Sequence, residues 1–138
     1  MIGEAIRSIL ATDAGVAGVV GGRIYPVRAA QRRTRPYITY QQVSGPRAQS
    51  MEGANGLSNP RMQVNCHADT YAAASALADK VRLALDGFNA DVDGVRVKAL
   101  LVNEYDGDDG PESASDTVVF AKSLDFSCWI NESTPAEN

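Results

Sequence analysis

The stretch RMQVNCHADTYAAASALADKVRLALDG, residues 61–87, changes its hydrophobic period once, and this change decides the fold class. Over residues 62–68, apolar and polar side chains alternate, which is typical of a strand with one buried face. After Asp69 and Thr70, either of which can cap a helix start, the apolar period becomes helical. The apolar positions of this helix are Ala74, Leu77, Ala78, Val81, Ala84, Leu85 and Phe88. Gly87 suits a left-handed helix end.

The same patterns extend outward in both directions. Apolar residues at helical spacing predict a helix over residues 2–12, and β-branched and aromatic residues predict strands over 37–43, 95–105 and 118–130. The hairpin-like spacing within 95–131 favours antiparallel pairing. We therefore expect an α+β fold in one domain, residues 1–138, with a mostly antiparallel sheet and two main helices on one of its faces.

Three segments lack a hydrophobic period. Glycines interrupt residues 13–22, which we interpret as a break after the first helix. Residues 44–60 are rich in Gly, Ser, Asn and Pro, and residues 106–117 read DGDDGPESASDT, so we expect long loops at both places. The end of the chain, 131–138, is expected to be a frayed tail.

Composition and charge narrow the class of protein. With 44% hydrophobic and 22% charged residues, the chain has ordinary globular usage. It contains no long apolar run, and Glu4 and Arg7 interrupt the first apolar segment, so neither a membrane span nor a signal peptide is expected. Residues 1–61 carry a net charge of +5 and residues 62–138 one of −9. Such a subunit can pair its unlike surfaces head to tail.

A search for catalytic or ligand-binding chemistry finds none. His67 is the only histidine and falls in a strand, where a surface or partly packed role is the simpler interpretation. Cys66 and Cys128 lie in apolar strand patterns and read as buried free thiols. The acidic run resembles a calcium loop at Asp106 and Asp108, but the later ligand positions do not match. We predict no enzyme, no metal site and no cofactor.

Four arginines, Arg28, Arg32, Arg33 and Arg35, form a basic cluster ahead of the strand at 37–43. Three interpretations stay open: a solvated segment, a protein interface and a nucleic-acid contact. Arginine suits bidentate pairing to carboxylates across an interface. A nucleic-acid binder usually adds lysines and a basic balance, whereas this chain has three lysines and a pI near 4.9. A small nucleic-acid-binding module is the alternative function.

Four stretches, in their order and spacing, resemble one known family: VVGGRIYPVRA, RPYITYQQVSG, RMQVNCHADTYAAASALADKVRLALDG and SLDFSCWI. They look like the tail-completion, or tail-terminator, proteins of long-tailed phages, prophages and gene-transfer particles. The resemblance implies a structural virion protein at the head–tail junction, made in the bacterial host cytoplasm. It also implies a ring, commonly a hexamer, that caps the tail tube, stops its polymerisation and joins it to the head connector. The length and acidity of 106–117, and His67 in place of a larger aromatic, depart from the family pattern.

Under this resemblance, the arginine cluster lies at an interface with another subunit or with the connector. On the acidic side, the candidate interface residues are Asp106, Asp108, Asp109 and Glu112. If the aspartates instead face the channel, they would repel phosphates and let DNA pass without specific binding. The loops at 44–60 and 106–117 are expected to become ordered on docking.

Overall fold

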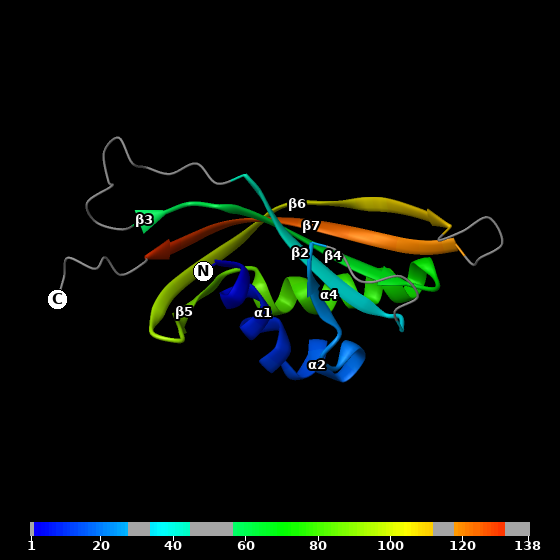
Figure 1. The fold of residues 1–138 in the computed structure, drawn as a ribbon, viewed down its shortest axis with the longest axis horizontal. Helices are drawn as coiled ribbons and strands as arrows, with labels where there is room; N and C mark the ends of the chain where they lie inside the picture. The colour runs from blue at the N-terminus through cyan, green and yellow to red at the C-terminus, as the bar shows by residue number, and fades with distance from the viewer. Residues whose placement is uncertain (1, 28–33, 45–56, 112–117, 132–138) are drawn as a thin grey trace.

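The computed structural model describes residues 2–27, 34–44, 57–111 and 118–131. Within them, the elements follow in the order α1 (Ile2–Thr12), α2 (Ala14–Val20), β1 (Ile24–Pro26), β2 (Tyr37–Ser44), β3 (Leu57–Ser58), β4 (Arg61–Ala68), α4 (Tyr71–Leu85), β5 (Phe88–Val92), β6 (Val95–Pro111) and β7 (Val118–Asn131). Figure 1 shows the three helices on one face of a curled sheet. The predicted α+β class is confirmed.

One sheet of seven strands forms the other layer, in the order β1-β2-β4-β7-β6-β5, with β3 paired to the end of β7. Every pairing is antiparallel except that of β1 with β2, which is parallel. The longest strand pairing is that of β6 with β7, and this hairpin extends beyond the helices (Figure 1). The sheet is thus mostly antiparallel, as the sequence predicts.

The strand-to-helix change at residues 61–87 occurs where the pattern predicts it. The alternate residues Met62, Val64 and Cys66 of β4 are fully buried. Thr70 is the N-cap of α4, and its Oγ1 accepts the backbone N–H of Ala73 at 3.1 Å. Gly87 follows the helix with φ +82°, a conformation that glycine adopts without strain.

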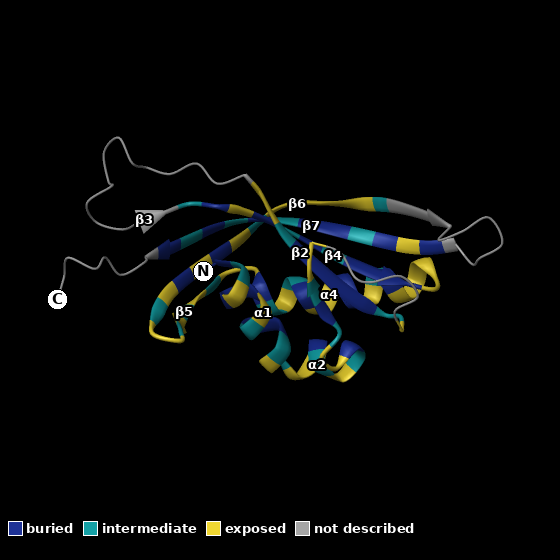
Figure 2. Ribbon diagram, in the orientation of Figure 1, coloured by how far each residue is buried: buried dark blue, intermediate teal, exposed yellow. Residues whose placement is uncertain are grey.

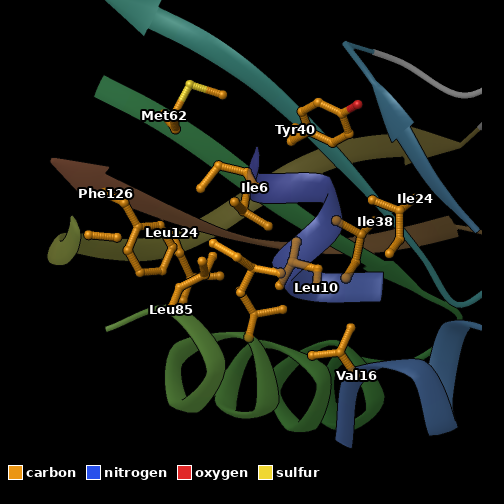
Figure 3. Packing of buried hydrophobic residues seen from close by; sticks show 14 of the residues in the cluster. Ile6, Leu10, Val16, Ile24, Ile38, Tyr40, Met62, Leu85, Leu124 and Phe126 are labelled. Atoms are coloured by element: carbon orange, nitrogen blue, oxygen red, sulfur yellow. The ribbon is translucent and has the colours of Figure 1, made fainter. Parts of the chain in front are cut away.

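The core fills the space between the helices and the sheet. Figure 3 shows Ile6 and Leu10 of α1 between the strands and α4, with Leu124 and Phe126 of β7 beside Leu85. All five side chains have 0% solvent exposure, so the layer between the helices and the sheet excludes water. Figure 2 shows the same division, with buried residues along β4 and β7 and exposed ones on the outward sides of the helices. No helix among the described residues is long and apolar enough to cross a membrane.

The first helix ends at Thr12 as predicted, but residues 14–20 of the glycine-containing segment form a second helix, so the prediction of an interruption over 13–22 is wrong for that part. Asp13 caps α2, and its Oδ2 accepts the N–H of Val16 at 3.0 Å. Val16 and Val20 are fully buried against the core. Burial of one apolar side of a short helix therefore outweighs the unfavourable helix propensity of its glycines.

The predicted loop at 106–117 is also partly wrong. β6 continues to Pro111, which pairs with Val118 of β7. Irregularities between Leu101 and Asn103 and between Asp108 and Gly110 let the ladder continue, because a bulge absorbs one extra residue. Residues 112–117 lie outside the described residues.

Three other boundaries differ from the predictions. Within the predicted loop 44–60, Ser44 ends β2 and Leu57–Ser58 form β3, while 45–56 lie outside the described residues. Asn131 pairs with Leu57 and is not frayed, and 132–138 lie outside the described residues. Phe88 does not end the helix but begins β5, which turns into β6 through Asp93 (φ 52°) and Gly94 (φ 85°). Asp-Gly is the expected composition of such a hairpin turn.

Candidate assembly interface

Arg35, the described member of the basic cluster, lies beside the start of α4. Its Nε donates to Oδ1 of Asp69 at 2.6 Å, and its side chain is 19% exposed against 60% for the aspartate. Because Asp69 directly precedes the cap residue Thr70, the carboxylate also lies at the positive end of the helix dipole. Arg35 thus meets a carboxylate of its own chain.

Asp106 forms a second charged cluster at the same end of α4. One carboxylate oxygen lies 3.1 Å from Nζ of Lys122, and the hydroxyl of Tyr71 donates to that carboxylate at 3.1 and 3.3 Å. Lys122 also lies 5.5 Å from the centroid of the Tyr71 ring. The hydrogen bonds from Lys122 and Tyr71 lower the pKa of the Asp106 carboxyl, and the bond to Asp106 raises the pKa of the Lys122 amine.

The structure therefore brings two of the predicted interface residues, Arg35 and Asp106, to the N-terminal end of α4, each with a different partner. Asp108 and Asp109 belong to β6, but their side chains are not described. Arg28, Arg32, Arg33 and Glu112 lie outside the described residues. The interface role of all these residues stays a prediction.

A polar network that the sequence pattern did not predict lies on the sheet face opposite the helices. Gln63 Nε2 donates to the hydroxyl of Tyr105 at 2.6 Å, and that hydroxyl donates to Asp125 at 3.3 Å. Ser123 donates to Asn65 at 2.6 Å. Partial burial and the charge of Asp125 raise the pKa of the Tyr105 phenol. Figure 1 shows the helices on the other face, so these hydrogen-bonded polar side chains lie on the side of the sheet that the helices do not cover.

The alternation of β4 pointed to Gln63 and Asn65, but not to their partners. Tyr105 comes from the part of β6 that follows the bulge between Leu101 and Asn103. A bulge changes which residues share a face, because side chains otherwise alternate strictly. The paired residues therefore depend on a register that period counting does not show.

His67 and the two thiols are packed inside the molecule. Nε2 of His67 lies 2.9 Å from Oγ1 of Thr39, and the ring stacks on Tyr37 at 4.6 Å between centroids. The histidine is 7% exposed, so it is more deeply buried than the surface or partly packed residue that we expected. Cys66 and Cys128 are buried free thiols, as predicted. Burial raises the pKa of the Cys66 thiol and raises that of Cys128 to about 12, so both are protonated at neutral pH.

No group of three or more His, Cys, Asp or Glu side chains that could hold a metal ion occurs among the described residues.

Comparison with models of protein families identifies the family of this chain. The family model described as "Tail completion protein gp17" matches residues 4–130, nearly the whole described fold. The chain belongs to this family of tail completion proteins. The resemblance noted in the four sequence stretches is thereby confirmed.

Solved structures give the same picture of the fold. Nineteen chains match, and one of them comes from a structure titled "Virion of native gene transfer agent (GTA) particle". It superposes with a TM-score of 0.70 at 17% sequence identity, covering 94% of this chain and 93% of that chain. At this identity the likeness shows the fold alone. None of the curated proteins compared with the chain matches it.

Membership of the tail completion family settles the class of function. The chain is a structural protein of a phage-like tail, it belongs to the virion, and it is not an enzyme. The prediction of a structural role without catalysis is confirmed on this ground.

Proposed function

We propose that this protein forms a ring on the end of the tail tube, stops further polymerisation of the tube and joins the tail to the head connector. The observation that carries the proposal is the match of the tail completion family to residues 4–130. The virion structure that shares the fold supports a place within a particle. The tail-tube protein and a connector protein are the proposed partners, and a hexamer is the proposed ring.

Two features of the described residues support assembly into a larger structure. The sheet face opposite the helices carries an ordered row of hydrogen-bonded polar side chains, including Gln63, Tyr105 and Asp125. The β6–β7 hairpin extends past the helices (Figure 1). Phe120 on this hairpin is 38% exposed, and Tyr71, which contacts Asp106 and Lys122 of the hairpin, is 48% exposed. Exposed aromatic side chains beside charged groups are typical of protein interfaces.

The arginine cluster has its place in this proposal as an interface with a neighbouring subunit or the connector. Arg35 is bound to Asp69, so Arg32 and Arg33 are the residues to change without disturbing an ion pair that the structure shows. On the acidic side of the proposed interface, Asp106 pairs with Lys122 of its own chain. If the carboxylates that follow Asp106 along β6 line the channel, they would repel the phosphates of DNA and keep it from adhering.

Light scattering on the purified protein at low and high salt, followed by electron microscopy with added tail tubes, tests the ring. Wild-type protein should form rings, alone or on tube ends, that loosen as salt screens their charge pairs. The variant Arg32→Glu/Arg33→Glu should lose them. The matched control Arg7→Glu/Lys80→Glu makes the same change in net charge at exposed helix positions and should keep them.

The outcomes separate the candidate functions. Rings of the arginine variant that still cap tubes would remove the interface claim. A protein that neither forms rings nor binds tubes would overturn the proposed role. Salt-sensitive retention of DNA by the wild type, lost in the arginine variant, would favour the nucleic-acid-binding module instead.

A further inference from the structure

The second half of β6 has a neighbouring strand on one side only. β5 pairs with Val95–Ala99, and from Leu100 to Pro111 the only strand that pairs with β6 among the described residues is β7. Figure 1 shows β5 beside the first part of β6 alone. Backbone N–H and C=O groups on such a border are left for water or for another strand. Residues 100–107, whose side chains the structure describes, form the open edge of the sheet.

Two backbone donors of the open edge are bonded to side chains, where an added strand would offer carbonyl groups. The N–H of Leu101 donates to Oδ1 of Asp86 at 2.9 Å, and the N–H of Glu104 donates to Oδ1 of the preceding residue, Asn103, at 3.1 Å. Because each N–H is bonded to a side chain, neither is needed for the ladder with β7. Side-chain oxygens compete with backbone carbonyls for such donors, so an incoming strand can replace both acceptors.

Apolar side chains beside the open edge are exposed to solvent. Leu100 and Val102 of β6 are 46% and 47% exposed. Leu83 of α4 is 75% exposed, and it lies one helical turn before Asp86, on the side of the helix that reaches the edge at Leu101. A strand added beside β6 extends the sheet on this side and removes part of this apolar surface from water, which favours its binding.

The charge along the open edge selects the kind of strand that binds. Glu104 is exposed, and neither Glu104 nor Asp86 makes an ion pair within the described residues. Further acidic residues follow along β6. The β6 edges of two copies, placed side by side, would bring these like charges together, which is destabilising between neighbouring strands. A strand with basic side chains instead matches the charge of the edge.

We infer that the open edge of β6 binds an extended segment of another protein of the particle, in which basic side chains alternate with apolar ones. The carbonyl groups of this segment accept the N–H groups of Leu101 and Glu104, as in other complexes that add a strand to a sheet edge. Its basic side chains pair with the Glu104 carboxylate, and its apolar side chains cover Val102 and Leu83. The inference rests on the proposed role in assembly but not on the ring, because strand addition needs only one copy of this chain.

Hydrogen exchange of the full chain tests the added strand, read by mass spectrometry on the fragment 100–107. Three samples are compared: the free chain, the chain assembled alone, and complete phage-like particles. Exchange should be at least about tenfold slower in the particles than in the other two samples, because strand pairing protects backbone amides. Protection that is already present in the chain assembled alone would assign the strand to a second copy and overturn the inference. Unchanged exchange in the particles overturns strand addition and leaves the proposed function intact, whereas particles without the chain overturn both.

Variants separate the backbone contact from the charge. Glu104→Pro removes the edge donor and no hydrogen bond to β7, and proline is tolerated on sheet edges. Glu104→Gln keeps the donor and removes only the charge, and its matched control is Asp93→Asn at the exposed β5–β6 turn.

Particles are assembled with equal amounts of wild type and one variant, and the ratio of the two chains in purified particles is measured by mass spectrometry. Glu104→Pro should be depleted about tenfold and Glu104→Gln about threefold, with Asp93→Asn unchanged. The urea midpoint of each variant shows whether it folds; should Glu104→Pro fail to fold, the comparison of Glu104→Gln with Asp93→Asn decides. Incorporation of the folded Glu104 variants at the level of wild type overturns the inference.

Discussion

The contact of α4 with the sheet allows a sharp test of the packing, because the helix carries two leucines in opposite environments. Leu77 is 1% exposed and belongs to the core, whereas Leu83 is 75% exposed. Replacing either by alanine makes the same chemical change in the same helix and alters helix propensity equally. Only the environment differs between the two variants.

Leu77→Ala should lower the free energy of unfolding by about 3 kcal/mol, from lost burial and the cavity left behind. With an urea dependence of about 2 kcal/mol per molar, the midpoint should fall by about 1.5 M. Leu83→Ala should shift the free energy by less than about 0.5 kcal/mol, because it removes little buried surface.

Urea unfolding can be followed by the fluorescence of Trp129, the only tryptophan. All variants must be compared at one low protein concentration, since assembly would stabilise the folded state by mass action. Equal midpoint shifts for the two variants, or a larger one for Leu83→Ala, would contradict the helix orientation described here.

Two further predictions concern titration and thiol reactivity. The lowered pKa of the Asp106 carboxyl means that its ionised form stabilises the fold above the usual carboxyl pKa, and that this contribution is lost as the pH falls through the lowered value. Asp106→Asn should therefore lower the urea midpoint at pH 7, with the difference from wild type shrinking below about pH 4; a constant difference would exclude the Lys122 and Tyr71 contacts as its cause. Cys66 and Cys128 should react with a thiol reagent only after unfolding, because both are buried and their raised pKa values keep them protonated; rapid labelling of the native protein would refute that burial.

Local patterns determined much of this fold. Alternation from Met62 to Ala68 and helical spacing from Ala74 to Leu85 predicted β4 and α4, since burial of one face depends on a period that can be read from the chain. The Asp93–Gly94 pair between β5 and β6 is likewise a local hairpin signal that can be read from the sequence. The basic and acidic halves are likewise a property of the sequence alone.

Tertiary structure decided the rest, because these features depend on which distant segments meet. Packing against the core made a helix of residues 14–20 despite their glycines. The bulge after Leu101 set the register that joins Tyr105 to Gln63 and Asp106 to Lys122. A pocket lined by Thr12, Phe88 and Asp93, among others, exists only because α1, α4 and the β5–β6 turn converge there. Periodicity specifies the face of an element that is buried, whereas contact between faces requires the packed chain.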